Sequence, residues 1–209
     1  MPFRDRTDAG DQLARALAEL DLPGPVVVGL PRGGLVVAAQ VAGSLGAPLD
    51  VVVVRKVRDP ENAALALGAV GEGGVRVANP TLLEEAGVGE ERYERLAADE
   101  EIGLRAQLER YRAVRPAIPL DDRVVIVVDD GLTTGASASV AATVVRGRDA
   151  ARVILAVPVS PPEAAETVRA SFDEVVCLET PELMLSLDEW YEDLPDVTDD
   201  EVVALLGKG

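Results

Sequence analysis

Short apolar runs recur along the chain and alternate with segments in which apolar residues follow helical spacing. The runs that predict buried strands are Val26–Val28, Val51–Val57, Val124–Val128, Arg152–Val159 and Glu174–Leu178. The segments that predict helices are an N-terminal stretch with Leu13, Leu17 and Leu20 on one stripe, Leu35–Gly46, Ala138–Val145 and an Ala-rich stretch after Pro161 and Pro162. This alternation predicts an α/β fold with a mainly parallel, twisted sheet and helices on both faces.

Two further segments depart from the alternation. Leu65–Val70 and Val75–Ala78 flank a Gly-rich turn, which predicts a β-hairpin with Glu72 at a solvated tip and without an assigned role. The segment Pro80–Pro119 is dense in Glu and Arg, with apolar positions near helical spacing. We expect one short and one long amphipathic helix there, with most faces in solvent.

Composition limits the class of protein. A chain of 209 residues with 48% hydrophobic residues buries a full core and most simply forms one domain. A net charge of −17 argues against non-specific binding to nucleic acid or to an anionic membrane, because both require basic patches. Cys177 is the only cysteine, and neither a signal peptide nor a membrane-length apolar stretch is evident. We therefore expect a reducing compartment and a cytoplasmic location.

The segment Val124–Ser137 carries the most specific chemical signal. Its apolar run ends in Asp129 and Asp130, which places two carboxylates where open α/β sheets bind ligands. The small-residue loop that follows leads into a predicted helix, whose unpaired first amides attract an anion. Gly131 and Gly135 permit close approach of the backbone, and nearby hydroxyls add donors. The segment therefore suits a phosphorylated ligand.

This segment has three other interpretations. It could be a solvated strand-to-helix turn with Ser137 as the N-cap. A nucleotide-binding P-loop requires a Lys directly before that Ser, and none is present. A phosphoacceptor receiver domain requires a Lys at some distance after the acidic pair, yet the only lysines are Lys56 and Lys208.

The segment resembles the 5-phosphoribosyl 1-diphosphate (PRPP) signature of the type I phosphoribosyltransferases. The resemblance implies that Asp129 and Asp130 bind the ribose 2- and 3-hydroxyls. It also implies that the loop binds the 5-phosphate through Thr133, Thr134, Gly135, Ala136 and Ser137. Mg²⁺ is then the expected cofactor, carried by PRPP without a direct protein ligand, and Asp129 and Asp130 are in a position to contact it through water.

A second Gly-rich loop follows the first apolar run. Pro31, Arg32, Gly33 and Gly34 match the diphosphate loop of the same family, where a non-prolyl cis peptide often aims amides at the ligand. We expect a cis bond between Pro31 and Arg32. An ordinary turn with a surface arginine is the alternative.

A basic pair ends the run Val51–Val57. Arg55 and Lys56 precede a polar loop, Arg58–Asn62, which in similar family members closes over the site. The resemblance gives Arg32, Arg55 and Lys56 the role of stabilising the departing diphosphate. The alternative is a solvated strand end.

The C-terminal stretch Thr180–Leu194 is similar to the hood of hypoxanthine-guanine phosphoribosyltransferases. That likeness places Leu183, Met184 and Leu185 in a base pocket that Trp190 or Tyr191 closes, whereas the sole Trp could instead pack in a core. We expect a single phosphoribosyltransferase-like domain over 1–209. Its predicted parts are a core at about 22–79 and 120–179, a helical insertion at 80–119 and a hood from 1–21 and 180–209.

The resemblance implies transfer of a phosphoribosyl group from PRPP to a nucleobase-like nitrogen acceptor, with release of diphosphate. Thr133 replaces an Asp that purine-salvage members use near the base, and 157–159 lacks the Lys with which they read a purine. A PRPP-binding regulatory or sensor protein is therefore the alternative. We expect a homo-oligomer, with the insertion as a candidate dimer element, and neither a nucleic-acid nor a membrane partner.

Overall fold

The computed structural model describes residues 3–208 and centres on a five-stranded parallel sheet. Its strand order is β2-β1-β6-β7-β8. The strands are β1 (Val26–Gly29), β2 (Leu49–Val51), β6 (Val124–Val128), β7 (Arg152–Val159) and β8 (Glu174–Glu179). In the register of the sheet, Val27 pairs with Leu49 on one side and with Ile126 on the other. The predicted parallel sheet is thus confirmed.

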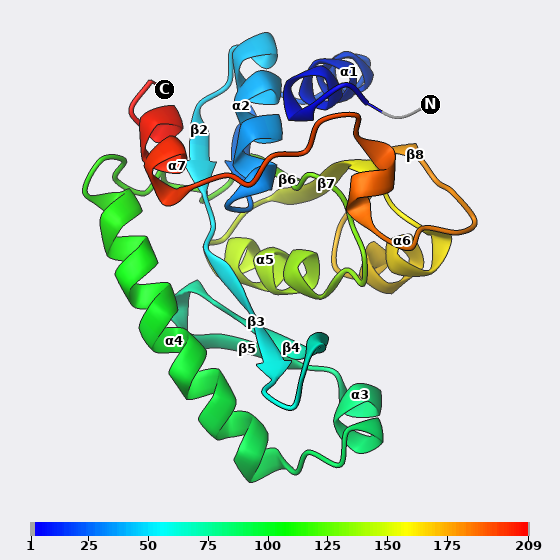
Figure 1. The fold of residues 1–209 in the computed structure, drawn as a ribbon. Coiled ribbons are helices and arrows are strands. Elements are labelled where there is room, and N and C mark those ends of the chain that lie inside the picture. The colour runs from blue at the N-terminus through cyan, green and yellow to red at the C-terminus, as the bar shows by residue number, and fades with distance from the viewer. Residues whose placement is uncertain (1–2, 209) are drawn as a thin grey trace.

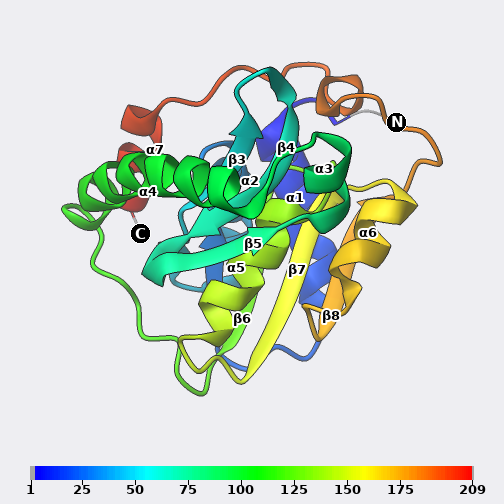
Figure 2. The same ribbon diagram turned by 90° about the horizontal axis from the view of Figure 1, so that it is seen from below.

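Helices cover both faces of this sheet (Figures 1 and 2). The helices α1 (Arg6–Ala18) and α2 (Gly33–Leu45) lie on one face, and α5 (Ala136–Arg146) and α6 (Pro162–Arg169) lie on the other. Successive strand residues point to opposite faces. Ile126 accordingly belongs to the core under α1 and α2, whereas Val127 belongs to the core under α5.

A second, three-stranded antiparallel sheet lies below the first in Figure 1. It consists of β3 (Val54–Asp59), β4 (Asn62–Gly71) and β5 (Val75–Ala78), with the short 3-10 helix η1 (Glu72–Gly74) between the last two. The predicted hairpin is therefore present, as two of the three strands of this sheet, which we call the flap (54–78).

The prediction of one strand over Val51–Val57 was wrong. The chain leaves the parallel sheet after Val51, and the Val53 amide donates 2.8 Å to Oε1 of Glu72. The predicted loop Arg58–Asn62 is also corrected, because Asp59 and Asn62 pair across a tight turn between β3 and β4. Arg55 and Lys56 consequently lie within an antiparallel strand.

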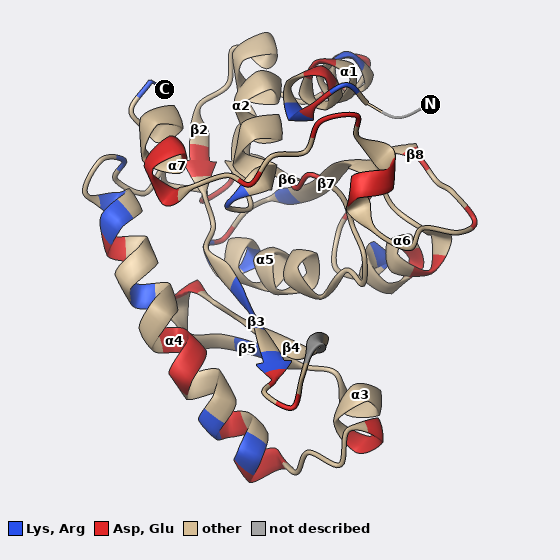
Figure 3. Ribbon diagram, in the orientation of Figure 1, with Lys and Arg blue, Asp and Glu red and all other residues tan. Residues whose placement is uncertain are grey.

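The segment 80–119 contains the predicted short and long helices, α3 (Pro80–Glu85) and α4 (Glu90–Arg112). Along α4, Tyr93, Leu104 and Tyr111 are buried. Acidic and basic positions are interspersed along the helix (Figure 3). The helix runs along the flap and reaches α7 (Asp199–Leu206). The C-terminal stretch also contains the 3-10 helix η2 (Leu187–Trp190). None of the helices within 3–208 has the length and apolar character of a membrane span.

Glu72 is buried, which corrects the expectation of a solvated hairpin tip. Its side chain is 6% exposed and forms ion pairs with Arg148, just beyond the end of α5, and with Arg112, the last residue of α4. Arg112 also pairs with Asp50, which is fully buried on β2. A buried carboxylate requires such partners, and these pairs fasten the flap and α4 to the parallel sheet.

Candidate active site

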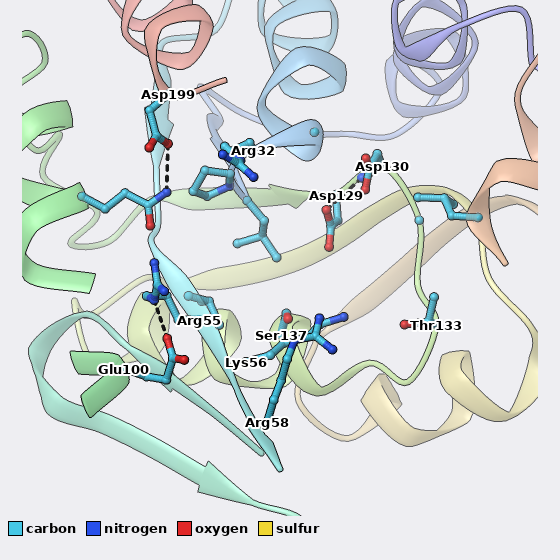
Figure 4. Close-up of a pocket in the computed structure, with 17 residues that line it drawn as sticks. Arg32, Arg55, Lys56, Arg58, Glu100, Asp129, Asp130, Thr133, Ser137 and Asp199 are labelled. Carbon is cyan, nitrogen blue, oxygen red and sulfur yellow. Dashed lines mark hydrogen bonds and ion pairs between the residues drawn. The ribbon is translucent and has the colours of Figure 1, made fainter. Parts of the chain in front are cut away.

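A cavity of about 660 Å³ opens between the carboxyl ends of β1 and β6 and the flap (Figure 4). Parallel strands of an open sheet bind ligands at this end. Five segments line the cavity: the loop before α2, strand β3, helix α4, the segment after β6, and the C-terminal region with η2 and α7. A smaller cavity of about 20 Å³ adjoins it and is formed mainly by residues 131–138.

The two predicted carboxylates lie side by side at the end of β6. Asp129 and Asp130 both line the larger cavity, and Oδ2 of Asp130 pairs with Nε of Arg6 at 2.8 Å. Burial, and secondly the neighbouring charge of Asp130, raises the pKa of Asp129 well above its usual value. A Cβ at Gly34 would lie 2.7 Å from Oδ1 of Asp129. Glycine there lets α2 begin against the acidic pair.

The predicted phosphate loop forms the wall of the smaller cavity. Thr133 and Ser137 line both cavities, and Thr134, Gly135 and Ala136 line the smaller one. Gly135, with a φ of 76°, is the N-cap of α5 and turns the chain into the helix. The first amides of α5 therefore face a space that suits an anion.

The loop before α2 adds a cation to the larger cavity. The predicted cis peptide bond between Pro31 and Arg32 is confirmed. Pro31, Arg32 and Gly33 line the larger cavity, and α2 begins at Gly33. Arg32 therefore lies at the rim that Asp129 and Asp130 also line (Figure 4).

Strand β3 contributes three further cations to the cavity: Arg55, Lys56 and Arg58. Lys56 lines both cavities and so lies between the phosphate loop and the larger space. Arg55 is held by Glu100 of α4, with 2.7 Å between Nε and Oε2. Arg58 was not singled out from the sequence, because it was assigned to the loop Arg58–Asn62, whereas it belongs to β3.

Sequence reasoning also missed the polar residues at the far end of the cavity. Glu100 and Gln107 come from α4, and Asp199 comes from α7. The Gln107 amide donates 3.2 Å to Oδ1 of Asp199 and 2.8 Å to the Tyr111 hydroxyl oxygen. Partial burial acts to raise the pKa of Asp199, but hydrogen bonds from Tyr111 and Gln107 and the charge of Arg32 lower it overall.

Among the residues that the structure describes, Met184 and Leu185 line neither of the two cavities. Leu185 is 77% exposed, and Met184 packs against a small cluster around Phe3 and Tyr191. From the same stretch, Leu187 of η2 does line the larger cavity. The prediction for Met184 and Leu185 failed because residues 180–186 form neither helix nor strand, so the apolar side chains of this stretch do not share one face.

The two aromatic residues proposed to close a base pocket have other partners. Tyr191 is buried and its hydroxyl donates 2.6 Å to the backbone oxygen of Asp130. Trp190 packs at the edge of the same cluster as Phe3. The Tyr191 side chain thus supports the acidic pair from behind.

Comparison with known proteins agrees with this geometry. The model of the phosphoribosyl transferase domain matches residues 7–194, so Arg6 and Asp199 lie outside the matched range. A Mycobacterium tuberculosis protein provisionally named a phosphoribosyl transferase is 45% identical over 206 residues in two strains. The match covers 99% of this chain and 46% of that protein, so the chain spans less than half the length of this relative.

Two solved structures resemble the whole chain. The protein TT1426 from Thermus thermophilus is 49% identical with a TM-score of 0.84, and the match covers 100% of this chain and 99% of TT1426. A hypothetical protein from Neisseria gonorrhoeae with bound ppGpp is 15% identical with a TM-score of 0.54, covers 100% of this chain and 97% of its own, and shares the fold. With the family match over residues 7–194, these findings show that the chain belongs to the phosphoribosyl transferase domain family.

Proposed function

We propose that this protein transfers the 5-phosphoribosyl group between PRPP and a nucleobase-like nitrogen acceptor, with release of diphosphate. The observation that carries the proposal is the convergence of three predicted groups on adjoining cavities. These are the acidic pair Asp129 and Asp130, the loop 133–137, and the cations Arg32, Arg55 and Lys56. Each matches a different part of PRPP: the ribose hydroxyls, the 5-phosphate and the diphosphate.

The reaction needs little covalent chemistry from the protein. As the bond from C1 to the diphosphate breaks, positive charge develops on the ribose and negative charge on the leaving group. In our proposal Asp129 and Asp130 fix the ribose through hydrogen bonds, while Arg32, Arg55 and Lys56 stabilise the diphosphate. Holding the acceptor nitrogen in line with C1 supplies the rest of the catalysis.

The residues present fit Mg²⁺ that is carried by the substrate. Within the described part of the chain there is no cluster of three or more His, Cys, Asp or Glu side chains that could hold a metal by itself. Mg²⁺ keeps several waters and binds readily to phosphates with one or two carboxylates nearby, which Asp129 and Asp130 provide. When bound, the ion neutralises charge on the diphosphate.

The acceptor is less well defined by the site than PRPP is. Thr133 lines the cavity where purine-type members carry an acid, and a Thr hydroxyl is not a general base near neutral pH. Val157 and Val159 are fully buried and offer no side-chain donor to a base. We infer that any nucleobase is read by backbone groups or discriminated weakly.

The test is an assay of base-dependent diphosphate release. The protein is incubated with PRPP, Mg²⁺ and a panel of purine and pyrimidine bases. Lys56→Ala serves as the variant that lacks one of the cations proposed to bind diphosphate. Release that requires one class of base, and that Lys56→Ala greatly reduces, supports transfer. Absence of release with every base, with PRPP binding intact, contradicts it.

A PRPP-binding sensor is the second candidate function. The observation that favours it is the position of Leu183 and Leu185, which are 74% and 77% exposed and contribute nothing to the lining of a base pocket. A sensor binds PRPP without base-dependent turnover. The same assay, read together with PRPP affinity, distinguishes the two functions.

A further inference from the structure

Arg6 stands directly behind one of the two carboxylates of the site. Its Nε lies 2.8 Å from Oδ2 of Asp130, and the two side chains are only 12% and 14% exposed. Its Nη1 donates 2.6 Å to the backbone oxygen of Pro195. The guanidinium therefore joins α1 and the C-terminal segment to the acidic pair.

The guanidinium holds Asp130 in one orientation. Its planar fork bonds Asp130 and Pro195 at once, and the Tyr191 hydroxyl holds the backbone of Asp130 at 2.6 Å. Arg6 occupies one acceptor site of this carboxylate, and an ionised carboxylate has about four, so Asp130 can still accept a hydrogen bond from a ligand. Among the described residues that line the two cavities, Arg6 is absent, so it acts on the site through Asp130.

Arg6 also offsets the repulsion between the two adjacent carboxylates. Asp129 and Asp130 are adjacent acids in a chain with a net charge of −17, and two neighbouring carboxylates repel one another. The charged or titratable groups that face the pair are Arg6 from α1, Lys56 from β3 and Tyr191 from the C-terminal segment. Of these, Arg6 is the one in direct ion-pair contact with Asp130.

We propose that Arg6 is a positioning residue for sugar recognition, which holds the Asp130 carboxylate so that it accepts a hydrogen bond from a ribose hydroxyl. The role rests on the proposed function, since it assumes that the acidic pair binds the ribose of PRPP. It assigns a function in the site to the N-terminal helix. It also predicts that Arg6 matters for ligands with ribose hydroxyls and not for a bare phosphate.

The test compares two ligands across four proteins. The proteins are the wild type, Arg6→Gln, Arg6→Lys and the control Arg4→Gln. Arg4 is the matched control because it forms an exposed ion pair with Asp8 beside the same helix, with its own side chain 74% exposed. The affinities for PRPP with Mg²⁺ and for inorganic phosphate are measured by calorimetry or by ligand-observed NMR, and melting temperatures check the fold.

Arg6→Gln should weaken PRPP binding about tenfold, or about 1.4 kcal/mol, and leave phosphate binding unchanged. Arg6→Lys should fall between it and the wild type, and Arg4→Gln should match the wild type. Equal PRPP affinity in Arg6→Gln and the wild type overturns the proposal, as does an equal loss for PRPP and phosphate. A wild type that binds phosphate but not PRPP contradicts the proposed function itself, and with it this role.

Discussion

Replacing Gly33 by Ala should weaken PRPP binding while leaving the fold almost intact. A Cβ at this first residue of α2 would lie 2.0 Å from Oδ2 of Asp130 and 2.7 Å from Nε of Arg6. To reach the 3.4 Å of an ordinary contact, the Asp130 oxygen must move by about 1.4 Å. The substitution therefore displaces the Asp130 carboxylate, which we assign to ribose recognition, and its ion pair with Arg6.

Gly33→Ala should change the unfolding free energy little and the PRPP affinity much more. The atoms that must move belong to side chains, so the cost in unfolding free energy lies at the low end of overpacking, about 1 kcal/mol. A gain in helix propensity of up to about 1 kcal/mol offsets it. Loss of a hydrogen bond to a charged group costs on the order of 1.5–3 kcal/mol, so PRPP affinity should fall roughly ten- to hundredfold.

The assay is titration calorimetry with PRPP and Mg²⁺, together with urea unfolding. Gly43→Ala is the matched control, since Gly43 lies on the same helix and a Cβ there meets nothing within 4 Å. That control should gain roughly 0.5–1 kcal/mol in stability and bind PRPP as the wild type does. Wild-type affinity in Gly33→Ala would refute the reasoning.

Three further changes have distinct expected outcomes. Glu72→Gln should lower the unfolding free energy by about 1.5–3 kcal/mol in urea titrations, because the partly buried Arg148 loses its charged partner while Arg112 keeps Asp50. The exposed-pair variant Glu91→Gln should change this free energy by under about 1 kcal/mol, and equal effects of the two variants would contradict this account. Glu100→Gln should strengthen diphosphate binding by up to about fivefold, because it frees Arg55 from a partly exposed ion pair worth about 0.2–1 kcal/mol. The measurement is calorimetric titration with diphosphate, and unchanged or weaker binding would contradict this role of Arg55. Asp129→Asn should raise the melting temperature at pH 7. The pKa of the Asp129 carboxyl is raised in the folded protein, so the wild type loses stability as the pH rises from the ordinary value of 3.8 through the folded-state pKa, and the Asn variant does not. The difference in melting temperature between variant and wild type should therefore vanish below pH 3.8, and an equal difference at all pH values would show that ionisation of Asp129 is not its cause.

Much of the fold could be predicted because its strands are local apolar runs. The exception is informative. Val52 and Val53 continue the apolar run without interruption, so no local pattern indicates that the sheet ends at Val51. The break depends on Glu72, nineteen positions further along, which accepts a hydrogen bond from the Val53 amide. Such non-local pairing is not visible in a periodic pattern.

The candidate site likewise contains residues that local motifs predict and residues that they do not. The acidic pair, the phosphate loop and the Arg32 loop are contiguous motifs, and the structure places them together. Glu100 and Asp199, by contrast, occupy charged helix positions that look the same in sequence as solvated ones. Arg6 has no local signal at all, because its partner Asp130 lies 124 positions away.

The most direct test of the central claim is PRPP binding to the acidic pair. Titration calorimetry with PRPP and Mg²⁺ is performed on the wild type and on the variant that combines Asp129→Asn with Asp130→Asn, with circular dichroism to verify the fold. The account predicts clear binding by the wild type and its loss in the folded variant. Undiminished PRPP binding in the variant would contradict the claim that these two carboxylates hold the ribose.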